Sequence, residues 1–229
     1  RLSAIDISPD QKYSFSDTAK RTLSKLEENV SVQLLVYGGK DALADEALHL
    51  ATYLERLCEY SKHASFEIVD LQKNTELAEV ASNYSVLVKT DKRERLIEFD
   101  SFFYLYMNGV GKVTTEQAQL YYSYYGDAVS FAYLFDGEGQ MLNALSYVTA
   151  DSLPKIYALS GHNEKALPED LLTTLGNGNI DSETLVLTEA GVPADCSVLF
   201  VNVPTIDVSA TEAAMLADYL NDGGKMILV

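Results

Sequence analysis

The chain has 229 residues, of which 47% are hydrophobic and 22% are charged, a balance typical of a folded globular protein. This length favours two domains over one. Acidic residues outnumber Lys and Arg by 34 to 17, and the resulting net charge of −17 argues against nucleic acid as a partner, because the surface repels phosphate backbones. Solubility is the simplest role for so many acidic residues.

The first part of the chain alternates predicted strands and helices. A strand is expected at residues 2–7, followed by a helix capped by Ser14 or Ser16. The elements that follow are a strand at 30–39, a helix at 42–62, a strand at 65–71, a short helix from Asn74 or Thr75, and a β-hairpin formed by 85–90 and 95–99. This order resembles the thioredoxin-like fold in topology and spacing. The redox dithiol of that fold is missing here, because Gly38-Gly39-Lys40-Asp41 occupy its position.

Residues 100–136 have weak periodicity and are crowded with tyrosines. We interpret this region as an insertion or an extended connection. Tyrosine is common at protein interfaces, so the region can serve as a contact surface. The alternative is a loop that packs its tyrosines back on its own domain.

A helix is predicted near residues 138–149, and Pro154 then interrupts the chain. We therefore place a domain boundary near residue 150, which gives a thioredoxin-like domain at 1–150 and a second α/β domain at 151–229. The two cysteines, Cys58 and Cys196, fall in different predicted domains and form no CxxC motif. Both are expected to be small buried core residues, and a disulfide between them would have to bridge the domains.

The second domain is predicted to contain a parallel sheet. Its elements are a strand at 155–159, a helix near 167–175, a short strand beginning at Glu183, a strand at 197–203 that is buried on both faces, and a helix with an S-x-x-E capping box formed by Ser209 and Glu212. Gly223 and Gly224 stop that helix. Residues 225–229 begin a new strand, so we expect the chain to be a piece of a longer protein.

The best candidate site lies where two predicted parallel strands end. The sequence Ser-Gly-His-Asn-Glu follows the strand at 155–159, and Pro-Thr-Ile-Asp follows the strand at 197–203. Ligands of open α/β sheets bind at this edge, so we expect these residues to converge on one crevice: Gly161, His162, Glu164, Thr205 and Asp207. The loop can instead be purely structural, with Gly161 leaving the strand and Asn163 or Glu164 capping the next helix.

Other chemistry has little support in the sequence. His162 and Glu164 alone do not make a metal site, and we expect neither a metal nor a cofactor. Ser160 has no G-x-S-x-G context, and Cys196 enters a strand rather than leaving one. The glycine-rich stretches at 38–39, 176–178 and 137–139 match no phosphate or calcium motif, so we interpret them as turns.

Three segments resemble one family. They are "KYSFSDTAKRTLSKLEENVSVQLLVYGG", "LPKIYALSGHNE" with its G-H-x-E turn, and "CSVLFVNVPTIDVSATEAAMLADYLNDGGKMILV" with a P…D-x-S-x-x-E…Y-L-x-x-G-G pattern. Together they span most of the chain from Tyr13 onward, and residues 100–136 depart from the pattern. The family is the auxiliary component of an uncharacterised class of ABC transport systems, the GldG-like proteins. Only Gly161, His162 and Glu164 are carried over, as motif positions.

The resemblance implies a non-catalytic, extracytoplasmic region of a membrane-anchored protein that acts beside an ABC permease and its ATPase. It also implies that the second domain is Rossmann-like, in the manner of class I amidotransferases without their cysteine. Two alternatives remain. One is a module that binds a sugar or another small polar ligand at residues 161–164 and 204–207, and the other is a hydrolase that uses His162 and Glu164.

Overall fold

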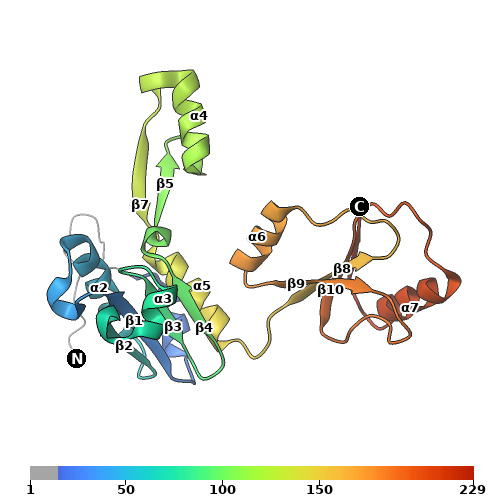
Figure 1. Cartoon of the computed structure of the whole chain (residues 1–229), viewed down its shortest axis with the longest axis horizontal. Helices are drawn as coiled ribbons and strands as arrows, with labels where there is room; N and C mark the ends of the chain where they lie inside the picture. The colour runs from blue at the N-terminus through green and yellow to red at the C-terminus, as the bar shows by residue number, and fades with distance from the viewer. Residues whose placement is uncertain (1–14) are drawn as a thin grey trace. The chain divides into compact units, whose positions relative to one another are not determined.

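The computed structural model describes residues 15–229, except for the side chain of Glu46, so the strand expected at 2–7 and the possible cap at Ser14 lie outside the described residues. The protein is a mixed α/β chain (Figure 1). It divides into two compact units, residues 1–149 and 150–229. Within residues 15–229, no helix combines the length and the apolar character needed to cross a membrane.

The first unit contains a four-stranded sheet in the order β2-β1-β3-β4. Strands β1 and β2 are parallel, whereas β3 is antiparallel to both of its neighbours. The elements are α1 (Asp17–Ser24), β1 (Val30–Val36), α2 (Asp45–Cys58), β2 (Ala64–Asp70), α3 (Thr75–Val80), β3 (Val86–Lys89), β4 (Glu94–Ile97) and α5 (Gly137–Thr149). From the first helix onward, the predicted succession of strands and helices, including the terminal hairpin, is confirmed.

Local hydrogen bonds explain where these elements begin and end. The Ser16 side chain accepts a hydrogen bond from the Ala19 N–H and caps α1, and Asn74 caps α3 through the Leu77 N–H. Strand β1 stops at Val36, earlier than predicted, because Gly38 and Gly39 take φ values of 88° and 68°, outside the extended region. The helix predicted from residue 42 starts later, at Asp45, because a 3₁₀ turn at Gly39–Ala42 precedes it.

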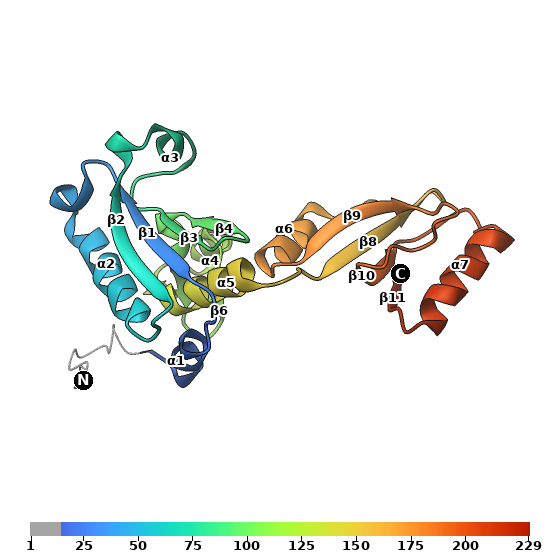
Figure 2. The same ribbon diagram turned by 90° about the horizontal axis from the view of Figure 1, so that it is seen from below.

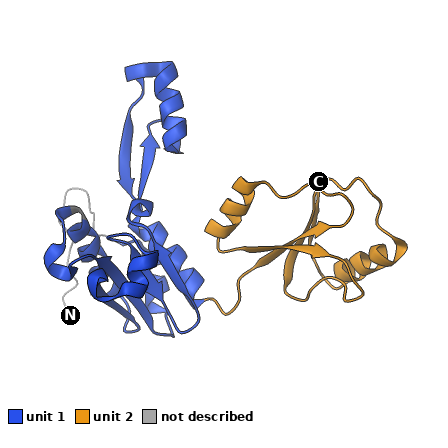
Figure 3. Cartoon of the chain, in the orientation of Figure 1, with its two compact units in different colours: residues 1–149 blue, residues 150–229 orange. Residues whose placement is uncertain are grey.

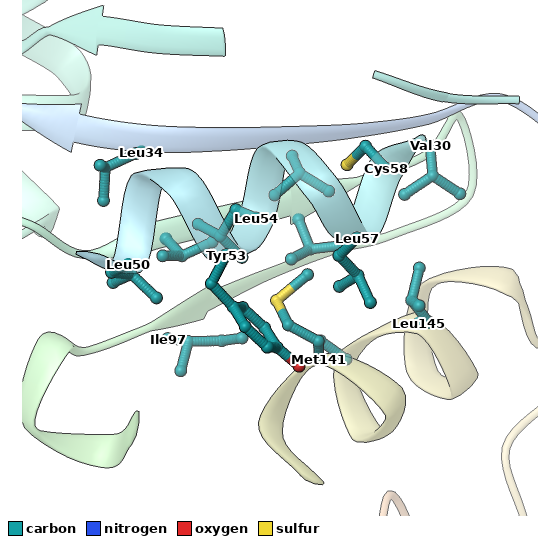
Figure 4. Close-up of a cluster of buried hydrophobic side chains, with 14 of the residues drawn as sticks. Val30, Leu34, Leu50, Tyr53, Leu54, Leu57, Cys58, Ile97, Met141 and Leu145 are labelled. Carbon is teal, nitrogen blue, oxygen red and sulfur yellow. The ribbon is translucent and has the colours of Figure 1, made fainter. Parts of the chain in front are cut away.

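Helices cover both faces of the sheet (Figure 2). One face packs against α1, α2 and α5, and its core includes Leu34, Leu54, Phe102, Met141 and Leu145. Figure 4 shows α2 and α5 facing each other across this cluster, with Met141 between them. The core on the opposite face, beneath α3, is smaller. Its buried residues are Leu35, Leu71, Ala81 and Leu87.

Cys58 belongs to the larger core, as its position on a helix stripe predicts. Burial raises the pKa of its thiol to about 12, so the group stays protonated and unreactive at neutral pH. Both Cys58 and Cys196 are free.

Residues 103–135, which we call the arm, form a folded substructure rather than an extended connection. The arm contains β5 (Phe103–Met107), β6 (Gly111–Val113), α4 (Thr115–Tyr125) and β7 (Phe131–Phe135). Its three strands form an antiparallel sheet in the order β6-β5-β7, and α4 packs on it through Met107, Val113 and Ala118. β5, β7 and α4 extend beyond the four-stranded sheet (Figure 1).

Aromatic rings join the arm to the core of the first unit. Phe135 contacts the rings of Tyr53, Phe102 and Phe103 at centroid distances of 5.1, 6.3 and 5.6 Å. Farther out, Tyr121 packs against the small core of the arm, but five other tyrosines are exposed. Exposed side chains are Tyr106, Tyr122, Tyr124, Tyr125 and Tyr133.

The second unit, coloured orange in Figure 3, contains a four-stranded parallel sheet in the order β11-β10-β8-β9. Its elements are β8 (Lys155–Ser160), α6 (Glu169–Asn177), β9 (Asp181–Val186), β10 (Cys196–Val201), α7 (Ala210–Asn221) and β11 (Met226–Leu228). The predicted capping box of α7 is present, since Ser209 and Glu212 each bond the backbone of the other. Gly223, with a φ of 91°, follows the helix as predicted.

Two predictions about β10 are wrong. Leu199 and Val201 are buried beneath α7, but Val198 and Phe200 on the other face are half-exposed. That face carries a pocket of about 350 Å³ lined by Ala158 and Ser160 of β8 and by Leu172 of α6, so α6 does not seal it. Cys196 is also half-exposed rather than buried, with its sulfur 3.5 Å from the Tyr219 hydroxyl.

Candidate functional site

The candidate site lies in the second unit, at the carboxyl end of two neighbouring parallel strands. Residues 161–166 follow β8 and residues 202–209 follow β10, and these strands pair directly. Gly161 allows the chain to turn sharply out of β8, because its φ of 123° is rarely open to other residues. The second loop leads into α7, so the N-terminus of that helix lies at the same edge.

His162 is the centre of the site. Its side chain is buried, and both ring nitrogens face carboxylates: Nδ1 lies 3.1 Å from Oε1 of Glu164, and Nε2 lies 3.3 Å from Oε1 of Glu212. The Glu164 carboxylate also accepts a hydrogen bond of 2.7 Å from the His162 backbone N–H. We call these three side chains the His162 triad.

The two loops are also joined beside the triad. The backbone carbonyl of His162 accepts hydrogen bonds from the N–H groups of Thr205 and Ile206, at 3.0 and 3.1 Å. The Asn163 side chain donates a 2.6 Å hydrogen bond to the Thr205 hydroxyl. Thr205 therefore reaches the site mainly through its backbone and through Asn163. Asp207 is exposed and makes no hydrogen bond or ion pair within residues 15–229.

Neither Asn163 nor Glu164 caps the next helix, so the prediction that one of them does is wrong. Helix α6 begins at Glu169, after Pro168, and has no side-chain cap. Residues 164–166 are held to the second loop instead. The Lys165 N–H donates to the carbonyl of Asn202, and the Asn202 side chain donates back to the carbonyl of Lys165, each at 2.9 Å.

Glu212 is the member of the triad that sequence reasoning missed. It was recognised only as part of the capping box, in which its carboxylate accepts a hydrogen bond from the Ser209 N–H. The topology contained the missing signal. A helix that follows one parallel strand starts at the edge where that strand ends, so Glu212 in the first turn of α7 lies at the same edge as His162 in the loop after the neighbouring strand.

The three members of the triad stabilise each other's charged forms. Burial lowers the pKa of the His162 imidazole, but hydrogen bonds to Glu212 and Glu164 outweigh it and raise the pKa above its usual value. Hydrogen bonds from Ser209, followed by that from His162, lower the pKa of Glu212 to about 2. Burial raises the pKa of Glu164, but backbone N–H groups and the His162 ring lower it by more. The raised pKa of His162 and the lowered pKa values of the two carboxylates thus each favour the charged form of the group.

Comparison of the chain with protein-family models, with curated proteins and with solved structures gives no match. In the described part of the chain, no group of three His, Cys, Asp or Glu residues is arranged to hold a metal ion.

The geometry favours a structural role for His162. A general base needs a free ring nitrogen within reach of the proton that it removes, and both nitrogens here already face carboxylates. No hydrogen bond joins Ser160 to His162 in the part of the chain that the structure describes. The triad thus ties the loop after β8 to the N-terminus of α7.

We expect the His162 ring to titrate above about 6.5, the usual value for an imidazole. Its pairs stabilise the fold fully below that value and are lost as the pH rises through the raised pKa of the folded state. Glu212 acts in the opposite direction, because its lowered pKa gives stability at neutral pH that is lost as the pH falls towards 2. Proton–nitrogen NMR titration of the imidazoles in the whole chain measures the first effect.

The matched variant for this titration is Glu212→Gln. Glutamine can also complete a capping box, so the helix start is kept while the charge is removed. The midpoint of His162 should fall, because the variant removes the carboxylate that faces Nε2 at 3.3 Å. An unchanged His162 midpoint would contradict the electrostatic role of Glu212.

Proposed function

We propose that the chain is a non-catalytic, extracytoplasmic accessory region of an ABC transport system, held at the membrane by segments outside this sequence. Its partners would be the permease and ATPase subunits. The observation that carries this proposal is the arm, which presents aromatic side chains with very few charges. The resemblance in the opening and closing segments supplies the class of partner.

The composition of the arm favours a protein contact. Only three of its 33 residues are charged, Lys112, Glu116 and Asp127, whereas 22% of the whole chain is charged. Interface cores are depleted of charge and enriched in tyrosine in the same way. On α4, Leu120 and Tyr124 are exposed and lie four residues apart, so they share one side of the helix.

The proposal also assigns a specific fold to each unit, beyond the mixed α/β class. The order β2-β1-β3-β4, with β3 antiparallel, supports a thioredoxin-like assignment for the first unit. The parallel sheet with α7 crossing between β10 and β11 supports a Rossmann-like assignment for the second. The His162 triad also supports a scaffold role, since both ring nitrogens of His162 face carboxylates of the same chain.

A second candidate function, binding of a sugar or another small polar ligand, is favoured by the pocket beside the triad. The pocket is lined in part by Ser160, Glu164, Lys165, Ser182 and Thr184, which offer hydroxyl, carboxylate and ammonium groups. It lies on the open face of the sheet rather than in the crevice expected between residues 161–164 and 204–207.

The test uses the intact protein, solubilised from membranes in mild detergent and recovered through a tag. Mass spectrometry should find an ABC permease and its ATPase at comparable abundance. The double substitution Leu120→Ser with Tyr124→Ser should lower recovery of the permease about tenfold, as loss of interface anchors does. Val80→Ser, at another exposed apolar residue, serves as the control and should change nothing.

Recovery of the protein from the soluble fraction without ABC subunits would overturn the accessory role. The pocket near Lys165 would then be the first place to search for a ligand. Equal recovery of the permease by the double variant and by the wild type would instead contradict the assignment of the contact to the arm.

A further inference from the structure

Strand β7 forms an unpaired edge of the arm sheet. Its only strand neighbour among the described residues is β5, and its residues from 132 to 135 are exposed. Proteins usually protect such edges with lysine, proline, a bulge or a covering segment. The sequence of β7, Phe-Ala-Tyr-Leu-Phe, contains no charged residue and no proline, and its pairing with β5 has an unbroken register.

The ladder with β5 shows which backbone groups face outward. The Asp136 N–H donates to the Phe102 carbonyl at 2.7 Å, so these two residues form a hydrogen-bonded pair. Hydrogen-bonded pairs alternate along an antiparallel ladder, which makes 104 with 134 and 106 with 132 the next such pairs. The N–H and C=O groups of Phe131, Tyr133 and Phe135 therefore point away from β5.

The same strand is nearly a palindrome. Read in reverse, Phe131–Phe135 has the same aromatic residues at both ends and in the centre, and only Ala132 and Leu134 exchange places. An antiparallel copy centred on Tyr133 would set Phe131 against Phe135 and Tyr133 against itself. On the other face it would set a small residue, Ala132, against a larger one, Leu134.

We propose that β7 pairs with β7 of a second copy of this chain about a two-fold axis through Tyr133. In this register the residues that meet as hydrogen-bonded pairs are those whose backbone groups already face outward. The strand brings no like charges together, although each chain carries a net charge of −17. The two arm sheets become one continuous sheet. This inference is independent of the proposed transport role.

Sedimentation of the purified chain tests the proposal. The wild type should pass from monomer to dimer as its concentration rises. Tyr133→Lys places two like charges opposite each other at the axis and should weaken the dimer at least about tenfold. The matched control is Tyr124→Lys on α4. Tyr124 is 77% exposed and Tyr133 is 74% exposed, so the two substituted residues differ in position rather than in burial. Tyr124→Lys should dimerise like the wild type.

A cysteine trap tests the register. Hydrogen-bonded partners have Cα atoms about 5.5 Å apart, within the range that a disulfide spans. Tyr133→Cys should therefore give a covalent dimer on mild oxidation. Ala132→Cys should not, because residue 132 of each chain lies two positions out of register with its copy, beyond disulfide reach. Both variants are made with Cys196→Ser, since Cys196 is half-exposed.

Dissociation by Tyr133→Lys together with selective trapping at 133 would support the pairing. A monomer at every concentration would overturn it, and so would a monomer that captures an extended segment of another protein at β7. A dimer that survives Tyr133→Lys, or one that is trapped equally at 132 and 133, would show that the chains associate elsewhere or in another register. None of these outcomes depends on recovery of ABC subunits.

Discussion

Phe102→Ala is expected to lower the free energy of unfolding of the first unit by about 3–5 kcal/mol. Phe102 is fully buried and is among the largest buried side chains of the chain. It lies in the core formed with α2 and α5, and its ring stacks on Phe135 at the root of the arm. Truncation would leave a cavity in a closely packed core, and the surrounding structure would fill it only in part.

Hydrogen exchange of the whole chain measures this loss unit by unit. Amides of β1 and β7 should exchange faster in Phe102→Ala, whereas amides of β8 and β10 in the second unit serve as an internal reference. The control is Phe99→Ala, three residues away. Phe99 is only half-buried and contacts Tyr84 and Phe103, so less than half of the effect is expected. Equal losses for the two variants would show that Phe102 is not the central packing residue.

Sequence reasoning succeeded where the signal is local. The start of helix α7 is predicted by its capping box, Ser209 and Glu212, which are three residues apart. Helix α5 is predicted by an apolar stripe whose members are all buried: Met141, Ala144, Leu145 and Val148. Such elements depend on spacing within one segment. The thiol of Cys58 was placed correctly for the same reason, since it continues the stripe of α2.

The arm could not be predicted in the same way. Its sheet depends on β5 pairing with β7 across an intervening hairpin and helix, with Phe103 opposite Phe135. Helix α4 buries one residue, Ala118, and so has almost no apolar stripe. Without that stripe, periodicity cannot distinguish a helix from a loop.

The candidate site shows the same division between local and distant signals. The loop at Gly161 to Glu164 was visible, and its place at the carboxyl edge of β8 followed from the parallel sheet. The pairing of His162 with Glu212 joins residues 50 positions apart in the sequence, and the capping box hid the second use of that carboxylate. The prediction that Asp207 joins the site is wrong for a simpler reason, because its side chain is exposed to solvent.

Glu164→Ala is expected to destabilise the second unit by about 1–3 kcal/mol, the cost of leaving buried donors without partners. The Glu164 side chain is only 3% exposed, and it serves both the backbone N–H and the ring Nδ1 of His162. Removing it would leave both groups unpaired and free the loop after β8. Exchange of the Thr205 and Ile206 amides, which donate to the His162 carbonyl, should accelerate by about tenfold to a hundredfold.

Two variants separate charge from hydrogen bonding in this result. Glu164→Gln keeps an acceptor oxygen and should cost less than Glu164→Ala, while Glu169→Ala, at an exposed first-turn position of α6, should stay within about 0.5 kcal/mol of the wild type. If Glu164→Ala were as stable as the wild type, Glu212 alone would suffice to hold His162. The second carboxylate would then be surplus to the fold, and a buried surplus carboxylate beside a polar pocket would favour ligand binding over a scaffold role.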